Sequence, residues 1–347
     1  MNTSKTICFV AGKSGGHIIP CLTLAQEVKV KEPGTKIIFF STCAPIDLHL
    51  LHKNPFVDAH IALSLTQLNP KKIYLLPVML YQLFASLFFS ARYLIKYKPQ
   101  RVISTGGFIA IPVCLIARML RIPIELYELN VQPGKALTFL APFAQTVHTC
   151  FKKTQQHFSK YHCAQTMYPV RFTQQDKHLG HDQAHQQLQL DPQKPTLLVL
   201  GGSQGSHFIN QTMKKILEQY PELHNTIQII HQTGEHDIAQ WCSWYAQHNI
   251  PAYVFEFQHD MSIYYCAADI IVCRAGAGTL FEVLFFNKSC IVIPLETTSN
   301  NHQLFNAQEM VIQYQRLFTM LRQQTIEKTP QVLVEAINRY LFSPKLH

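Results

Sequence analysis

Three glycine-rich turns in the chain place backbone N–H groups where an anion could bind. They are Gly12 to Gly16, Gly201 to Gly205 and the segment Cys273 to Val283, and each lies between an apolar run and a helical pattern. Glycine allows a ligand to approach the backbone closely, and the first turn of a helix offers N–H groups and a positive dipole to phosphate. The first turn contains Gly-Lys-Ser, the end of a P-loop, but Ile7 stands where that motif requires glycine. We therefore predict a phosphate or sugar loop rather than a triphosphate P-loop.

Two side chains beside these turns are chemically suited to accept a proton and to bind a nucleotide. His17 directly follows Gly16, and an imidazole can act as a general base near neutral pH, although it could instead cap the helix or shape the turn. Glu282 lies one helical turn after Gly278, where a carboxylate could accept two hydrogen bonds from a ribose diol. Glycine-rich turns on two domains favour a ligand that binds in the cleft between the domains.

These turns need strands and helices to hold them, and the chain alternates between the two along its whole length. Apolar runs typical of strands are TICFV, KIIFFS, RVIST, IPIELYE, TLLVL, IQIIHQ, AYVFEF, DIIVC and CIVIP. This alternation predicts an α/β fold with parallel sheets. The pattern begins again at TLLVL, so we predict two domains, residues 1–171 and 172–329, separated at a polar, Gln- and His-rich segment. A C-terminal helix at about residues 330–347 is expected to pack back on the first domain.

Charge is distributed unevenly in this chain of 347 residues, whose net charge is +9. Residues 1–168 carry a net charge of +12, and the remainder carries −3. A basic half predicts an anionic partner, either nucleic acid or an anionic membrane. The ten cysteines are scattered without a C-x-x-C pair, as is typical of free thiols in a reducing compartment. The N-terminal apolar run is too short for a signal peptide, so we expect a cytoplasmic protein.

Tyr74 to Ala91 is an uncharged stretch of 18 residues with basic residues on both sides. Its length permits a helix that spans a bilayer, a helix that lies on the membrane surface, or a buried helix of the first domain. Pro77, Gln82 and the α/β pattern on both sides argue against spanning. We predict a helix that is partly buried and partly exposed as a membrane-docking patch.

Three histidines, His178, His181 and His185, lie in the polar boundary segment at spacings that could place them on one helical face. A metal could bind there, but no cysteine or dependable fourth ligand accompanies them. We therefore predict a solvated, locally helical surface and no metal site.

Eight segments of the chain, taken in order, resemble motifs of the MurG family of bacterial glycosyltransferases. They are GKSGGHIIPCLTLA, TGGF, YELNVQPG, YPVR, GGSQGS, HQTG, CRAGAGTLFEV and NNHQLFNA. The resemblance covers nearly the whole chain and implies a GT-B fold, with two Rossmann-like domains and an interdomain cleft. It implies inverting transfer of GlcNAc from UDP-GlcNAc to the MurNAc 4-hydroxyl of lipid I (undecaprenyl-pyrophosphoryl-MurNAc-pentapeptide), which gives lipid II and UDP.

The resemblance also implies where and with what such an enzyme works. No metal or other cofactor is required, and nucleic acid is not a partner. The expected location is the cytoplasmic face of the plasma membrane, where the enzyme binds the anionic surface peripherally, with cell-wall synthesis proteins as further expected partners.

Carried over residue by residue, the resemblance implies one catalytic residue and a set of substrate contacts. His17 is the general base, and Arg171 and Ser203 meet the diphosphate. Glu282 holds the ribose hydroxyls, and Gln303 binds those of GlcNAc. The other implied substrate-binding residues are Ser14, Gly15, Gly16, Asn130, Gln258, Ala277, Gly278 and Thr279.

The chain departs from the family's motifs at a few positions that lie mostly outside the donor core. Lys13 replaces a glycine of the first turn, Tyr127 replaces the His of H-E-x-N, and Tyr168 replaces the Asn of N-P-V-R. Asn300 and Asn301 replace an acidic pair. We expect a divergent but working enzyme. The alternatives are another GT-B enzyme with a different acceptor, a UDP-GlcNAc 2-epimerase, and a non-catalytic nucleotide-sugar-binding protein at the membrane surface.

Overall fold

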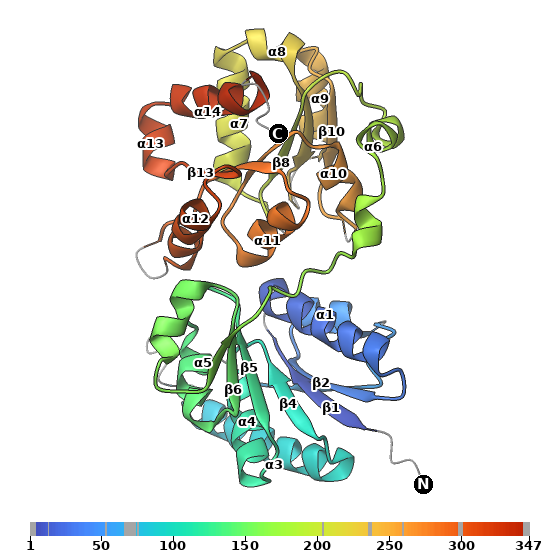
Figure 1. The fold of residues 1–347 in the computed structure, drawn as a ribbon, viewed down its shortest axis with the longest axis vertical. Coiled ribbons are helices and arrows are strands. Elements are labelled where there is room, and N and C mark those ends of the chain that lie inside the picture. The colour runs from blue at the N-terminus through green and yellow to red at the C-terminus, as the bar shows by residue number, and fades with distance from the viewer. Residues whose placement is uncertain are drawn as a thin grey trace. The chain divides into compact units, whose positions relative to one another are not determined.

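The computed structural model describes residues 5–12, 14–52, 54–65, 74, 76–202, 205–234, 238–258, 260–297 and 301–342. The chain forms two compact units, Met1–Arg171 and Phe172–His347, and each contains one sheet with helices packed on it (Figure 1). Every strand pair in both sheets is parallel, so the predicted α/β fold with two parallel-sheet units is confirmed.

The first unit contains a seven-stranded sheet in the order β3-β2-β1-β4-β5-β6-β7. Its strands are β1 (Thr6–Val10), β2 (Lys36–Thr42), β3 (Ala59–Leu63), β4 (Arg101–Ser104), β5 (Ile124–Glu128), β6 (Thr146–Thr149) and β7 (Cys163–Gln165). Its helices are α1 (Gly15–Lys31), α2 (Pro45–His52), α3 (Leu76–Tyr97), α4 (Ala110–Met119), α5 (Lys135–Leu140), η2 (Ala141–Phe143) and η3 (Lys152–Phe158). The strand order reverses between β1 and β4, and ligands of open α/β sheets bind at such a reversal.

The residues of β1 are buried on both faces of this sheet. Ile7 and Phe9 belong to the core cluster that contains α1 side chains, whereas Cys8 and Val10 belong to the cluster that contains α3 and α4 side chains. Successive side chains of a strand point to opposite faces. A strand with helices on both faces of its sheet therefore reads as a continuous apolar run, as TICFV does.

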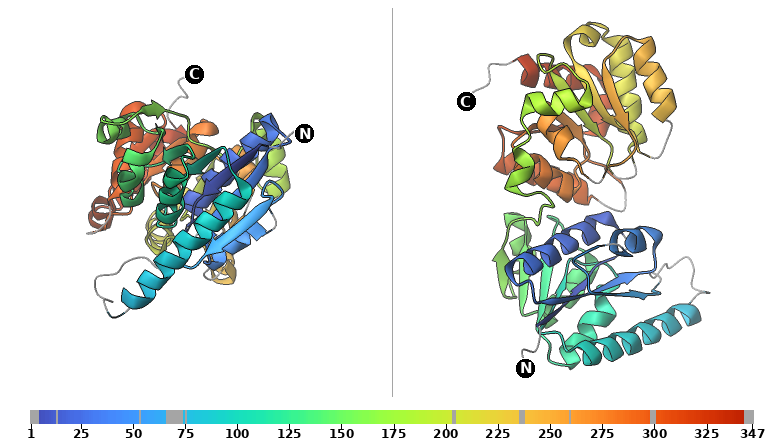
Figure 2. Two further views of the ribbon diagram at one scale, coloured as in Figure 1. Left: turned by 90° about the horizontal axis from the view of Figure 1, so that it is seen from below. Right: turned by 90° about the vertical axis from the view of Figure 1, so that its right-hand side faces the viewer.

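The helix α3 packs against α4 along a narrow stripe and exposes much of its apolar surface. Its buried side chains are Met79, Ser86, Ser90 and Leu94. On the exposed side, Tyr81, Phe84 and Phe88 are 75%, 66% and 62% exposed. Figure 2 shows α3 as the long cyan helix that extends past the strands. Within the described part of the chain, α3 is the one helix that is long and apolar enough to cross a membrane, judged by length and composition alone.

The second unit contains a six-stranded sheet in the order β10-β9-β8-β11-β12-β13. Its strands are β8 (Thr196–Leu200), β9 (Gln228–Gln232), β10 (Ala252–Phe255), β11 (Ile270–Cys273), β12 (Ser289–Val292) and β13 (Phe318–Met320). Its helices are η4 (Gln174–Lys177), α6 (His181–Leu188), α7 (His207–Gln219), α8 (Glu222–Thr226), α9 (Ile238–Gln247), α10 (Ser262–Ala267), α11 (Ala277–Phe285), α12 (His302–Gln313), α13 (Gln323–Lys328) and α14 (Gln331–Phe342).

The C-terminal helix α14, expected from sequence to pack on the first domain, contributes side chains to the core of the second unit. Leu333 and Ile337 are 0% exposed and share a core cluster with side chains of α7 and α9. The helix also contacts β11 and β12. Its apolar residues recur at helical spacing, and that stripe is buried by the face of the nearest sheet.

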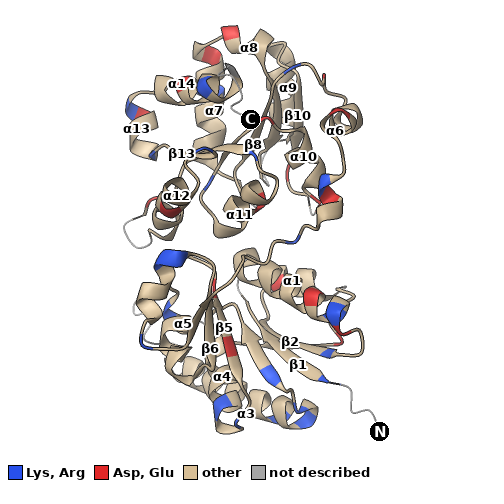
Figure 3. Ribbon diagram, in the orientation of Figure 1, with Lys and Arg blue, Asp and Glu red and all other residues tan. Residues whose placement is uncertain are grey.

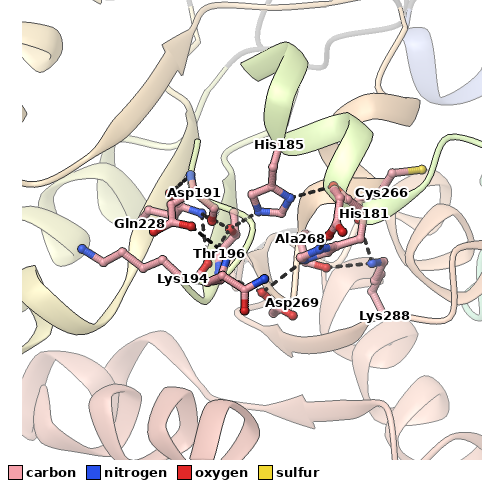
Figure 4. Close-up of polar contacts among 12 residues, drawn as sticks. His181, His185, Asp191, Lys194, Thr196, Gln228, Cys266, Ala268, Asp269 and Lys288 are labelled. Carbon is pink, nitrogen blue, oxygen red and sulfur yellow. Dashed lines mark hydrogen bonds and ion pairs between the residues drawn. The ribbon is translucent and has the colours of Figure 1, made fainter. Parts of the chain in front are cut away.

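The polar segment at the start of the second unit is helical, but the prediction of a solvated surface is wrong for His185. This side chain is 0% exposed, and its Nε2 atom lies 2.7 Å from the Thr196 hydroxyl (Figure 4). Its Nδ1 atom donates to the His181 carbonyl oxygen at 2.8 Å. The Gln228 amide donates to the same Thr196 hydroxyl at 2.8 Å, so α6 is tied to the starts of β8 and β9. No group of three possible metal ligands occurs among the described residues.

Candidate functional site

In the first unit, four of the predicted residues lie at the N-terminus of α1, after the carboxyl end of β1. Ser14 is the N-cap of this helix, and Gly15, Gly16 and His17 form its first turn directly after β1. That turn contains no acidic residue. The positive end of the helix dipole can therefore attract an anion. Asn130 follows β5, and β5 ends at the same edge because the sheet is parallel.

His17 is held by a reciprocal pair of hydrogen bonds with Thr105, the residue that follows β4. The Nδ1 atom of His17 lies 2.8 Å from the Thr105 carbonyl oxygen, and the Thr105 hydroxyl donates to the His17 carbonyl oxygen at 2.8 Å. A carbonyl oxygen can only accept, so Nδ1 carries the proton of the neutral ring and Nε2 presents a lone pair. This tautomer is the one that a general base acting through Nε2 requires.

The turn after Thr105 packs directly on the first glycine-rich turn. Gly107 has a φ of +87°, and a Cβ atom at this position would lie 3.0 Å from the Gly12 carbonyl oxygen. A side chain here would strain the backbone and push the two turns apart. The TGGF segment is thus a packing element that sets the position of the loop carrying His17.

The loop that contains Asn130 is shaped by Glu128, whose side chain is 1% exposed. The Glu128 carboxylate accepts from the backbone N–H groups of Asn130 at 3.0 Å and Gly134 at 2.8 Å. Burial raises the pKa of Glu128 to about 7. The sequence interpretation did not single out this residue, although its place inside the YELN motif was an available signal.

Tyr127, which stands where the family has a histidine, stacks on the ring of His148 with the ring centroids 4.4 Å apart. Burial raises the pKa of Tyr127 to about 12. The phenol therefore stays protonated near neutral pH, and Tyr127 does not supply a base in place of that histidine.

In the second unit, the second and third glycine-rich turns follow β8 and β11, between which the strand order reverses. The helix α11 begins at Ala277, with Gly278 and Thr279 in its first turn, and no acidic residue occurs in that turn. The helix α7 begins at His207 after the second glycine-rich turn, also without an acidic residue in its first turn. Both N-termini can therefore offer N–H groups to a diphosphate. Ser203 lies outside the described residues.

Glu282 and Gln303 both make contacts within the second unit. The Glu282 carboxylate accepts from the Tyr265 hydroxyl at 2.8 Å. The Gln303 amide oxygen accepts from the backbone N–H groups of Ala275 at 3.2 Å and Leu295 at 3.0 Å. These last two bonds tie together the loops after β11 and β12. A hydrogen bond from Gln303 to a sugar would accordingly come from its NH₂ group.

Arg274, in the third glycine-rich turn, connects that turn to Ser206, the N-cap residue after the second turn, a role that the sequence interpretation missed. Its Nε atom donates to the Ser206 hydroxyl at 3.0 Å, and its Nη1 atom donates to the Ile293 carbonyl oxygen at 3.2 Å. Burial lowers the pKa of Arg274 from its usual value. An arginine remains protonated at neutral pH even so. A positive charge therefore lies next to the loops predicted to bind a diphosphate.

Gln258 and Arg171 lie in connecting segments outside the helices and strands. Gln258 is exposed and follows β10, next to Phe257, which is 39% exposed. Arg171 is the last residue of the first unit. The next residue, Phe172, is 9% exposed, and its ring lies 5.9 Å from the ring of Tyr265.

A buried chain of hydrogen bonds supports the second glycine-rich turn. The Asn210 amide donates to the Thr233 carbonyl oxygen at 3.0 Å, so its own oxygen faces His231 Nε2 at 3.2 Å. His231 Nδ1 then accepts from the Tyr245 hydroxyl at 2.9 Å. Gly205 packs against the Thr233 carbonyl group, where this series of hydrogen bonds ends. A Cβ atom on Gly205 would clash with the Thr233 carbonyl oxygen.

The neutral state of His231 predicts that stability falls in mild acid. Burial lowers the pKa of His231 to about 3. Below pH 6.5, His231 is protonated in the unfolded chain but stays neutral in the folded chain. The free energy of unfolding should therefore fall by up to about 1.4 kcal/mol per pH unit until the pH reaches the pKa of the folded state. Urea unfolding at pH 7 and at pH 5 measures this fall in the free energy of unfolding. Between these two pH values the fall should be about 2 kcal/mol smaller in His231→Gln than in the wild type, because glutamine does not titrate. An equal loss in both proteins would contradict the assignment.

Comparison with known proteins shows that both units match domain models of the same protein family. The model of the glycosyltransferase family 28 N-terminal domain matches residues 7–149, and the model of its C-terminal domain matches residues 196–346. The crystal structure of MurG from Acinetobacter baumannii has a TM-score of 0.74 and 23% identity, with 96% of this chain and 91% of that chain covered. This structural likeness supports the GT-B fold that the sequence predicted.

Two curated relatives carry the same descriptive name, UDP-N-acetylglucosamine–N-acetylmuramyl-(pentapeptide) pyrophosphoryl-undecaprenol N-acetylglucosamine transferase. The protein from an Anaeromyxobacter species is 33% identical over 301 residues, which is 87% of this chain and 77% of the relative. The protein from Thermodesulfovibrio yellowstonii is 30% identical over 340 residues, which is 98% of this chain and 91% of the relative.

Proposed function

The chain belongs to the MurG family within glycosyltransferase family 28, and from this membership we propose that it transfers GlcNAc from UDP-GlcNAc to lipid I. The products are lipid II and UDP. The observation that carries the proposal is the shared name of relatives that are 30% or more identical over most of the chain.

The first unit supplies the general base in this mechanism. His17 Nε2 takes the proton from the MurNAc 4-hydroxyl as that oxygen attacks C1 of the donor sugar. Thr105 holds the ring in the required tautomer through its carbonyl oxygen, 2.8 Å from His17 Nδ1. The new C1–oxygen bond forms on the face opposite UDP, so the α-linked donor gives a β(1→4) product.

The second unit holds the donor and stabilises the departing UDP. As the bond between C1 and the phosphate oxygen breaks, negative charge builds up on the diphosphate. The N-termini of α7 and α11, together with Arg171 and Ser203, would stabilise this charge, and Arg274 would add a positive charge beside Ser206. Glu282 would accept from the ribose hydroxyls, the backbone at Gln258 would contact uracil, and the reaction would need no metal.

The reaction is tested by product analysis with UDP-GlcNAc, with and without a lipid I analogue. We expect UDP and a disaccharide lipid only when the acceptor is present, and we expect exhaustive EDTA treatment to leave the rate unchanged. Formation without acceptor of UDP-N-acetylmannosamine, or of N-acetylmannosamine and UDP if water cleaves the sugar–phosphate bond, would indicate an epimerase. Binding without any product would indicate a nucleotide-sugar-binding protein. Loss of activity with EDTA and its return with Mg²⁺ or Mn²⁺ would contradict the metal-free mechanism.

The exposed face of α3 supports peripheral binding at the cytoplasmic surface of the membrane. Tyr81, Phe84 and Phe88 present aromatic side chains outward, and Arg92 and Lys96 follow them on the same helix. Figure 3 shows basic residues on α3 and on neighbouring elements of the first unit. Aromatic groups can enter the lipid interface while nearby basic groups meet anionic headgroups.

Replacing Phe84 and Phe88 together with glutamate should lower binding to phosphatidylglycerol vesicles by ~10-fold or more, because charges replace apolar groups that would enter the interface. Wild-type binding should also weaken as salt is raised. Co-sedimentation with vesicles measures both effects. Val30→Glu is the matched control, since Val30 is 72% exposed on α1 and should not contact lipid. Membrane extraction that needs detergent and resists high salt and alkali would favour a spanning helix instead.

A further inference from the structure

The hydroxyl group of Tyr265 contacts the carboxylate that the proposed function assigns to the ribose. Tyr265 lies on α10, Glu282 lies on α11, and the hydroxyl donates to Glu282 Oε2 at 2.8 Å. On the basis of the proposed function, we propose that Tyr265 is a positioning residue that fixes the Glu282 carboxylate for recognition of the ribose cis-diol. Tyr265 would thus set the preference for ribonucleotide over deoxyribonucleotide donors.

Tyr265 is itself held rigidly, so its hydroxyl has a defined position. The side chain is 1% exposed. Its ring stacks on Phe286 with the centroids 5.0 Å apart and the planes at 12°, and it meets the edge of Phe172 at 5.9 Å. Such packed aromatic rings hold one geometry. A hydroxyl on this ring is therefore a fixed donor.

The side chain of Tyr265 contacts Glu282 on α11 and Phe286, the C-cap residue directly after that helix. Glu282 and Phe286 are four residues apart, and side chains at this spacing are neighbours on a helix surface. The ring stacks on Phe286 while the hydroxyl reaches Glu282. One rigid side chain on α10 therefore sets the orientation of a glutamate that would otherwise sample many rotamers.

The Tyr265 contact has a chemical consequence for donor selection. A carboxylate offers about four acceptor positions, and the Tyr265 hydroxyl occupies one of them. A carboxylate held in this way can meet the two adjacent hydroxyls of a ribose together. A mobile carboxylate could bind both hydroxyls only after losing side-chain conformational entropy. A ligand without the 2′-hydroxyl would leave part of this acceptor unpaired, and sites built on such bonds discriminate strongly.

The test compares UDP with 2′-deoxy-UDP by calorimetry in the wild type and in Tyr265→Phe. The wild type should bind UDP ~10-fold or more tightly than 2′-deoxy-UDP, and Tyr265→Phe should reduce this ratio by ~3–10-fold. The KM for UDP-GlcNAc should rise by a similar factor while kcat changes by less than about 2-fold, as expected for a contact present in both ground and transition states. In a Glu282→Gln background, Tyr265→Phe should alter UDP affinity by less than about 2-fold.

Tyr264→Phe is the matched control, because it removes the same hydroxyl group from the same helix. Tyr264 is 4% exposed, stacks on Phe255 at 4.4 Å and has Tyr253 as its hydrogen-bond partner. This variant should keep the wild-type ratio of the two affinities.

Two outcomes separate this inference from the proposed function on which it rests. The positioning role is overturned if Tyr265→Phe keeps the wild-type ratio, with or without a lowered melting temperature, while Glu282→Ala still weakens UDP binding. If Glu282→Ala leaves UDP binding unchanged, the assignment of Glu282 to the ribose fails, and the positioning role fails with it.

Discussion

Replacing His17 with alanine is expected to lower the turnover number by about 10²–10⁴-fold, the usual contribution of a general base. The affinity for UDP should stay close to that of the wild type, because His17 is not among the proposed UDP contacts, which apart from Arg171 lie in the second unit. Steady-state kinetics with saturating lipid I analogue measure the turnover, and calorimetry measures UDP affinity. A variant that retains more than about a tenth of wild-type turnover would contradict the assignment, since the loss of a base cannot be that small.

The substitution His17→Asn separates catalysis from loop shaping. An asparagine amide can donate to the Thr105 carbonyl oxygen in place of the His17 Nδ1–H group, which makes that bond at 2.8 Å. It has no basic nitrogen to accept a proton. His17→Asn should therefore be as impaired in turnover as His17→Ala. Recovery of activity in the asparagine variant would mean that the ring only shapes the loop.

The substitution Glu282→Ala is expected to weaken UDP binding by roughly 1–3 kcal/mol, which corresponds to about 5–150-fold in affinity. The cost arises because ribose hydroxyls lose their acceptor and Tyr265 loses the group to which its hydroxyl donates at 2.8 Å. Calorimetric titration with UDP measures this effect. Glu327→Ala is the control, since Glu327 is an exposed residue on α13. Its carboxylate accepts a hydrogen bond from the Gln323 amide on the same helix. Equal UDP affinities in wild type and Glu282→Ala would rule out the ribose contact.

Most strands predicted from sequence are apolar runs in the interior of each sheet, although the edge strand β10 was also predicted and the interior strand β6 was not. β1 and β8 read as TICFV and TLLVL because both of their faces are covered. The edge strands β3, β7 and β13 were not predicted. β7 and β13 have only three residues each, and β3 has just two buried residues in five. Edge strands are partly exposed, so their sequences need not be apolar.

The burial of α14 and of His185 shows what sequence patterns do not predict. Both α14 and α6, the helix that contains His185, were predicted correctly as helices, because helical periodicity can be recognised within a few turns. Which surface buries the helix depends on the shapes of elements distant in sequence. The apolar stripe of α14 fits the second sheet, and the imidazole of His185 satisfies its hydrogen bonds next to Thr196 instead of in water.

Local residue spacing and motif order are enough to predict the two-unit α/β organisation, the glycine-rich turns and the family. They do not predict how the candidate side chains are held, which depends on contacts in the folded protein. His17 meets Thr105 across 88 residues, and Tyr265 meets Glu282 across 17 residues. Such contacts form only when parallel strands bring their carboxyl ends to one edge and helices pack on the faces. Their geometry therefore cannot be read from residues that are neighbours in the chain.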